Sequence, residues 1–142
     1  MKKIYLDTEF NGFNGELISM ALVSETGEEF YEVLECENPV PWVKQHVMPI
    51  LNKEPVTLKQ LQLELEKYLM QFGGVRIIAD WPEDLVHFCK CLLNGPGFRI
   101  NYPNNFEMVI DKMLPDTALH SKIPHNALED ARSLAKYTQS QE

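Results

Sequence analysis

The stretch Ile4-Tyr5-Leu6-Asp7-Thr8-Glu9-Phe10 has the composition of a buried strand, yet it carries two acids. Side chains alternate along a strand, so Asp7 and Glu9 are expected to project from the same face, roughly 7 Å apart. Two like charges at the end of a core strand repel each other, and burial strengthens the repulsion. A bound divalent cation would relieve this conflict, and ligands that are all oxygen favour Mg²⁺ or Mn²⁺.

A histidine and a further acid lie near the other end of the chain, in His125-Asn126-Ala127-Leu128-Glu129-Asp130-Ala131. Helical spacing predicts one inward stripe, formed by Ala127, Ala131, Leu134, Ala135 and Thr138. Asp130 falls on this stripe, where a carboxylate needs a partner, and a metal shared with the first strand would supply one. Asn126 and Glu129 have the spacing of a capping box, which predicts a helix start there. His125 would then lie in the preceding loop, free to move toward a substrate.

Two acids lie close together in the middle of the sequence. Asp80 and Asp84 flank Trp81-Pro82-Glu83 at an expected turn from strand to helix. The spacing of Asp80 and Glu83 is that of a capping box, which predicts that Asp80 caps the helix. Asp84 would lie in the first helical turn, where the helix dipole favours a carboxylate.

The rest of the pattern predicts an α/β fold. Strands are expected at residues 2–9, 16–24 and 28–35, and these three form an antiparallel meander. Helices and strands then alternate, with helices at 42–51, 57–72, 82–93 and 127–139, a strand at 75–79 and another within 98–110. Residues 94–97 are expected to form a loop. Such an order gives a mixed sheet, antiparallel and then parallel, flanked by helices.

Bulk properties indicate one soluble domain covering residues 1–142. The sequence has no apolar run long enough for a membrane span and no apolar leader, so no membrane association is expected. The three cysteines are Cys36, Cys89 and Cys91, and they lack metal-binding spacing. Reduced thiols in a cytoplasmic protein are the expectation.

The net charge of −8 opposes a long electrostatic track for duplex nucleic acid. Part of that charge belongs to the acids already described, and two divalent ions would neutralise it locally. Surrounding lysines would still be able to meet a phosphate or two. The balance favours a short or single-stranded substrate.

The two motifs together resemble a known family. Asp-x-Glu on a first strand and His-x4-Asp at a last helix are similar to the motifs of the DEDDh 3′–5′ exonucleases of the RNase H-like fold. The resemblance is greatest to the small bacterial 3′–5′ exoribonuclease-like members, and it covers nearly the whole chain. Glu16-Leu17-Ile18-Ser19 and Trp42-Val43-Lys44-Gln45-His46-Val47 also look like that subgroup. The resemblance implies an RNase H-like mixed sheet.

It also implies the roles of the site residues. The implied ligands of two Mg²⁺ or Mn²⁺ ions are Asp7, Glu9, Asp84 and Asp130. In two-metal cleavage one ion activates water and the other stabilises the leaving oxygen, with Asp7 bridging them. His125 would act as the general base. The family's middle aspartate lies a few residues beyond the strand, which favours Asp84 and leaves Asp80 as the second choice, although the chain lacks the commoner Asn-x-x-Phe-Asp form.

The expected function is therefore a metal-dependent 3′–5′ exonuclease that acts on 3′ ends of RNA or single-stranded DNA, with RNA preferred. Phe10, Phe13 and Trp81 are expected either to stack on terminal bases or to pack in the core. The other histidines, His46, His87 and His120, are expected to be structural. A nucleic-acid-binding or accessory module without turnover is one alternative, and an exonuclease acting mainly on DNA is another. The sequence leaves a homodimer open.

Overall fold

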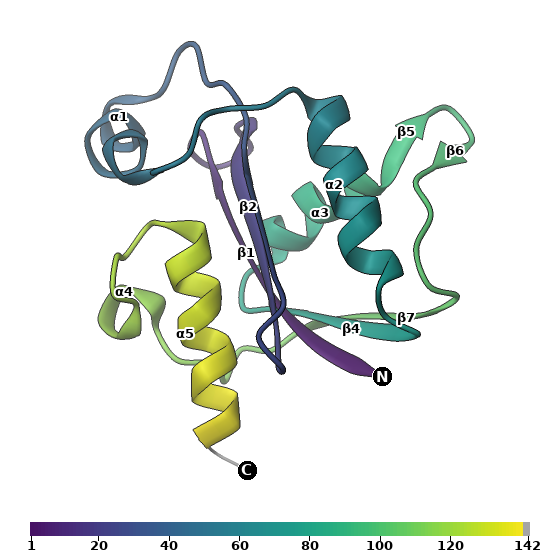
Figure 1. The fold of residues 1–142 in the computed structure, drawn as a ribbon. Coiled ribbons are helices and arrows are strands. Elements are labelled where there is room, and N and C mark those ends of the chain that lie inside the picture. Colours follow the sequence, from purple (N-terminus) through teal and green to yellow (C-terminus); the bar gives the residue numbers. More distant parts are fainter. Residues whose placement is uncertain (141–142) are drawn as a thin grey trace.

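A computed structural model describes residues 1–140, and their centre is a five-stranded sheet in the order β3-β2-β1-β4-β7 (Figure 1). Its strands are β1 (Lys2–Phe10), β2 (Leu17–Ser24), β3 (Glu29–Val33), β4 (Gly74–Ala79) and β7 (Asn105–Ile110). The pairs β1/β2 and β2/β3 are antiparallel, whereas β1/β4 and β4/β7 are parallel. The prediction of an α/β fold with a mixed sheet is confirmed.

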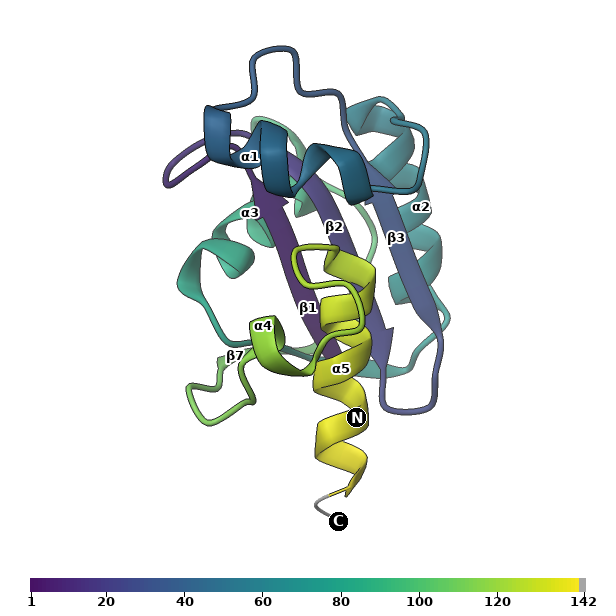
Figure 2. The ribbon, with the colours of Figure 1, turned by 90° about the vertical axis from the view of Figure 1, so that its left-hand side faces the viewer.

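Helices cover both faces of this sheet. The larger ones are α2 (Leu58–Met70), α3 (Pro82–Leu92) and α5 (Ala127–Ser140). Figures 1 and 2 show α5 on one face and α2 with α3 on the other. The shorter ones are α1 (Pro41–His46), the 3-10 turn η1 (Met48–Ile50) and α4 (Thr117–His120). The arrangement is consistent with an RNase H-like fold.

Alternation along β1 decides which side chains face which helices. Ile4 and Leu6 pack in the core beneath α2 and α3. Tyr5 points the other way and packs against α5. The period of two therefore directs Asp7 toward α5 and Thr8 toward α3. Side chains at the end of this one strand thus face both helical layers of the fold.

Some local expectations need correction. The helix expected at 42–51 is divided into α1 and η1, where Pro49 supplies no N–H to continue an α-helical ladder. Residues 94–97 are not simply a loop, because β5 (Leu93–Gly95) and β6 (Phe98–Arg99) pair as a small hairpin. The helix α4 was not expected, and Asp116 caps it by accepting a hydrogen bond from the N–H of Ala118.

Within the described residues, no helix is long and apolar enough to span a membrane. The three cysteines, Cys36, Cys89 and Cys91, are free thiols.

Candidate active site

The sheet opens beside the end of β1. The parallel partner β4 pairs with β1 only from Lys2 to Tyr5 and then ends at Ala79. β1 continues beyond this pairing, and Asp7 and Glu9 lie on its continuation with their side chains on the side of α5. Crevices at the carboxyl ends of parallel strands are common ligand sites in α/β sheets, because the following loops diverge there.

Asp130 of α5 meets the two acids of β1 at this opening. One carboxylate oxygen from each of Asp7, Glu9 and Asp130 lies within 4.8 Å of the others. The helix is positioned by Asn126, whose Oδ1 accepts a hydrogen bond from the N–H of Glu129 at 3.0 Å. The predicted cap and the predicted inward direction of Asp130, which is 3% exposed, are both seen.

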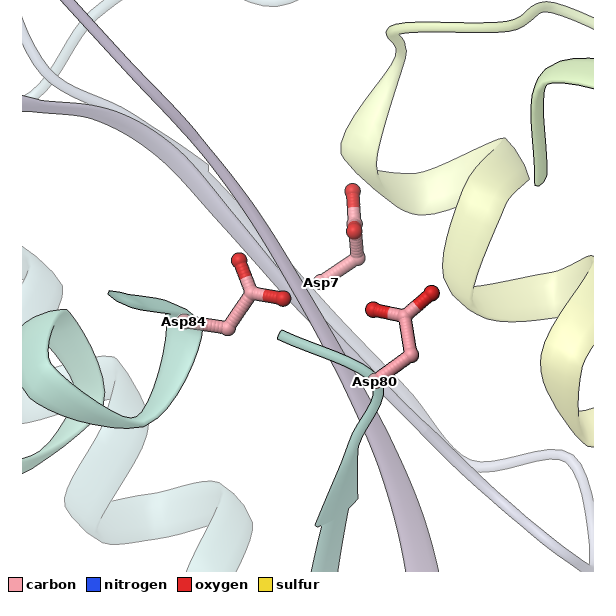
Figure 3. A group of neighbouring side chains, drawn as sticks. All are labelled: Asp7, Asp80 and Asp84. Carbon is pink, nitrogen blue, oxygen red and sulfur yellow. The ribbon is translucent and has the colours of Figure 1, made fainter. Parts of the chain in front are cut away.

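Both middle acids also approach Asp7. Oxygens of Asp7, Asp80 and Asp84 lie within 4.8 Å of one another, and Figure 3 shows these side chains coming from β1, the end of β4 and the first turn of α3. Asp84 is 3% exposed, and its Oδ1 accepts a hydrogen bond from Oγ1 of Thr8 at 2.6 Å. Asp80 is more exposed, and its backbone carbonyl accepts a hydrogen bond from Lys112.

The prediction that Asp80 caps α3 is wrong. The N-cap residue is Trp81, which makes no side-chain capping bond, and Pro82 follows at the first helical position. Proline favours that position and holds the preceding residue extended, so the helix begins one residue later than the capping-box spacing indicates. The carboxyl group of Asp80 is therefore left beside Asp7.

Burial is the main cause of the unusual electrostatics of this cluster. It raises the pKa of Asp7 well above its ordinary value, and the charges of Asp84, Glu9 and Asp130 raise it further. The pKa of Glu9 is raised in the same way, first by burial and then by Asp130 and Asp84. Burial raises the pKa of Asp84 to about 7 and that of Asp130 to about 6. The cluster therefore favours either protonation or a cation among the carboxylates.

Two oxygens indicate that a cation fits the cluster. Oδ2 of Asp7 and Oδ1 of Asp130 are buried and make no hydrogen bond within the described part of the chain. An unsatisfied buried carboxylate oxygen is costly, and a hard divalent ion coordinated by oxygen would satisfy it. The residues present thus fit Mg²⁺ or Mn²⁺ by their donor chemistry.

His125 lies next to these acids and contacts Asp130 and Trp42. It lies in the loop before α5 with a φ of 74°, and its N–H donates to Oδ2 of Asp130 at 3.3 Å. The edge-to-face contact of its ring with Trp42 has a centroid distance of 4.9 Å. The location in a loop is confirmed, and the ring packs against Trp42 of α1.

His46, which was expected to be structural, is a neighbour of His125. The rings of His46 and His125 are 6.5 Å apart, and Trp42 packs against both. Burial lowers the pKa of His125, and the charge of His46 lowers it further. His87, by contrast, stacks on Phe10 and is buried, in line with a structural role.

A cavity of about 470 Å³ leads to the acids. Its wall combines the carboxylates with four large rings, those of Phe10, Phe13, Trp42 and Trp81. Phe13 is 79% exposed, and it lies 6.4 Å from Trp81 between ring centroids. An acidic floor with aromatic walls suits a ligand that carries both a metal-binding group and a flat ring.

The fold and the site together define an α/β domain with acids gathered at the end of the central strand of a mixed sheet. No family model matches the chain. The chain is 35% identical over 104 residues to two curated 3′–5′ exoribonucleases of Mycobacterium tuberculosis, from strains CDC 1551 and H37Rv. The match covers 66% of this chain and 62% of each relative, a little less than two thirds of their length. The similarity to bacterial 3′–5′ exoribonucleases that the motifs indicated is confirmed.

Proposed function

We propose that this protein is a metal-dependent 3′–5′ exoribonuclease that shortens single-stranded RNA from its 3′ end. The observation that carries the proposal is the convergence of buried acids from β1, α3 and α5 on one opening, two of which have unsatisfied oxygens. Such a cluster is costly in a structural core and suits a metal site. The similarity to the mycobacterial exoribonucleases supports the same reaction class.

We assign the metal ligands from the two groups of acids. Asp7 belongs to both groups, so it would contact both ions. Glu9 and Asp130 would complete one ion's ligands, and Asp84 would complete the other's. When bound, such ions activate water and stabilise the leaving oxygen of a phosphodiester. Thr8 orients the Asp84 carboxylate toward this position through its hydrogen bond.

Asp84 is preferred to Asp80 on structural grounds. Its burial and its bond from Thr8 fix one orientation of the carboxylate, as a metal ligand requires. Asp80 is less buried and has no such bond from a β1 side chain in the described residues. Because Asp80 also lies near Asp7, a comparison of Asp80→Asn with Asp84→Asn distinguishes the two acids.

His125 is proposed as the general base. One of its ring nitrogens would accept a proton from the attacking water, a function that contributes roughly 10²- to 10⁴-fold to rates. Contact with Trp42 orients the imidazole, and the lowered pKa keeps it neutral near pH 7. A neutral ring can accept the proton, whereas a protonated one cannot.

The aromatic wall of the cavity would bind the terminal base. Phe13 and Trp81 expose flat ring surfaces beside the acids, and stacking contributes on the order of 1–3 kcal/mol per base. Stacking tolerates any base, which suits an exonuclease that proceeds through mixed sequence. The preference for RNA over DNA rests on the activity of the relatives. A protein distinguishes RNA from DNA through a contact to the 2′-hydroxyl.

Labelled oligomers test the proposal. Purified protein should release mononucleotides from the 3′ end of RNA with Mg²⁺ or Mn²⁺, and none with a chelator. A 3′-phosphate should slow the reaction, because its added charge crowds the carboxylates. The matched control is Asp130→Asn, which keeps the shape of the side chain and removes its charge. Cleavage of a circular RNA would instead indicate an endonuclease, and RNA binding without any cleavage would indicate a module that lacks turnover.

A further inference from the structure

A second cavity, of about 350 Å³, lies between α4, the loop after it and the outer side of α5. In contrast to the acidic opening, its lining is mostly basic: His120, Lys122, Glu129, Arg132, Ser133 and Lys136. A concentration of positive charge is unusual in a chain whose net charge is −8. Some of these charges are paired within the fold and others are not.

Arg132 is shared by two acids, Glu129 and Glu29. The Arg132 guanidinium pairs with Glu129 on the same helix and with both carboxylate oxygens of Glu29 on β3. Lys122 and Lys136, in contrast, make no ion pair within residues 1–140. The two ammonium groups exceed the one extra carboxylate of the Arg132 group, so the charge around this cavity is net positive and favours an anionic ligand.

The basic cavity adjoins the acidic one. Thr117, the first residue of α4, lines the acidic cavity, while His120 in the same short helix lines the basic one. The two positions are three residues apart, ~4.5 Å of helical rise. Ser133 also lies in the basic cavity, and its hydroxyl donates to the backbone carbonyl of Asp130 at 2.7 Å. Figure 2 shows α4 beside α5 on this face of the molecule.

Building on the proposed exonuclease activity, we propose that Lys122 and Lys136 form a subsite for a backbone phosphate of the substrate strand, upstream of its 3′-terminal nucleotide. A strand whose 3′ end lies among the acids can leave across α4 and meet these lysines next. The lysines offset the repulsion that an acidic cavity exerts on a polyanion. Lysine suits this task because its ammonium is a compact charge that binds phosphate without reading the base.

The test compares two variants with equal loss of charge. Lys122→Gln combined with Lys136→Gln removes the proposed subsite. The matched control is Lys59→Gln combined with Lys90→Gln, because these exposed lysines lie on α2 and α3, on the other face of the sheet. Binding is measured by fluorescence anisotropy in chelator, with labelled single-stranded RNA of about ten nucleotides and with a dinucleotide.

The subsite variant should bind the longer RNA about three- to tenfold more weakly than the control variant does. The slope of log K against log salt should fall by ~0.7 for each phosphate contact that is lost. The difference should be much smaller for the dinucleotide, because its single phosphate is the scissile one among the acids and none is left to reach the lysines. DNA of the same length should show the same loss as RNA, because a phosphate contact ignores the 2′-hydroxyl.

Equal binding by the two variants overturns the subsite, and so does a loss seen with RNA but not with DNA. Steady-state kinetics with Mg²⁺ separates this result from failure of the proposed function. If hydrolysis is normal but KM for the long oligomer is the same in both variants, the subsite is wrong and the exonuclease assignment stands. If no oligomer is hydrolysed, the exonuclease assignment fails, while the binding comparison still decides whether the lysines contact phosphate.

Discussion

The hydroxyl of Thr8 donates a hydrogen bond to Oδ1 of Asp84 over 2.6 Å and thereby links β1 to α3 across 76 residues of chain. Thr8 follows Asp7, so its side chain points to the opposite face of the sheet. β1 consequently contributes Asp7 and Glu9 to the cluster and orients Asp84 through Thr8. Both partners of the bond are buried, with exposures of 4% for Thr8 and 3% for Asp84.

Thr8→Val should destabilise the protein, because it keeps the shape of the side chain but removes the donor. A buried acceptor left without its hydrogen bond costs about 1–3 kcal/mol in the free energy of unfolding. Thr8→Ser retains the hydroxyl and should recover most of that loss, apart from the missing methyl group. Urea unfolding in chelator measures the difference. Equal stability of the valine variant and wild type would show that the bond contributes little.

Asp84→Asn should reduce the rate of hydrolysis by orders of magnitude while the fold is maintained. The asparagine Oδ1 can still accept the hydrogen bond from Thr8, so the change removes mainly the charge that would hold an ion. Asp80→Asn should have a mild effect, because Asp80 neither caps α3 nor receives a bond from β1. Single-turnover rates at saturating Mg²⁺ compare the two variants. The opposite order of effects would transfer the role to Asp80.

Much of the acidic cluster was predictable because it follows from local periodicity. The period of two along β1 placed Asp7 and Glu9 on one face, and the helical period placed Asp130 on the inward side of α5. The structure brings all three together, as that reasoning predicts. Asn126 was recognisable as the cap because its motif lies within a few residues of chain.

Contacts between distant segments were not predictable in the same way. Trp42 and His125 are far apart in the chain, and no local pattern indicates that their rings meet. Asp80 was misjudged for a local reason, since the preference of Pro82 for the first helical position outweighed the capping-box spacing. The lysine pair beside α4 also depends on tertiary structure, because that helix is only four residues long and lacks a periodic pattern.

Metal-free protein should become less stable as the pH rises from about 4 to about 7. Burial raises the folded-state pKa of Asp84 from 3.8 to about 7 and that of Asp130 from 3.8 to about 6. Each carboxyl group therefore binds a proton more tightly in the folded chain than in the unfolded one. This contribution to stability is fully present below the unfolded pKa and is lost as the pH passes the folded pKa. Urea unfolding in chelator across this range measures the loss.

Two controls identify the cause of this decline in stability with pH. Asp130→Asn removes one of the titrating groups, so it should flatten the decline and raise stability at alkaline pH in chelator. Saturating Mg²⁺ or Mn²⁺ should reverse the trend in wild type, because the ion binds the deprotonated carboxylates and stabilises the folded state. A wild-type profile that is flat in chelator would contradict the raised pKa values. An equal stabilisation of wild type and Asp130→Asn by the ion would contradict the assignment of Asp130 as a ligand.

His125→Ala should lower the turnover rate by roughly 10²- to 10⁴-fold if the imidazole is the general base. Its effect on metal affinity should be small, because the proposed ligands are carboxylates. The wild-type rate should rise with pH through a limb below 6.5, since burial and the charge of His46 both lower the pKa of His125. That limb should be absent from the alanine variant.

His46→Gln provides the directional test of the same prediction. Removing the nearby positive charge should raise the pKa of His125 toward 6.5 and move the rate limb to higher pH. Water bound to the metal titrates as well, so the profiles must be measured with both Mg²⁺ and Mn²⁺. A limb that belongs to His125 should move with His46→Gln and stay nearly fixed between the two metals. A limb that moves with the metal but ignores His46 would assign the titration to bound water, and full activity of His125→Ala would leave the histidine with no catalytic role.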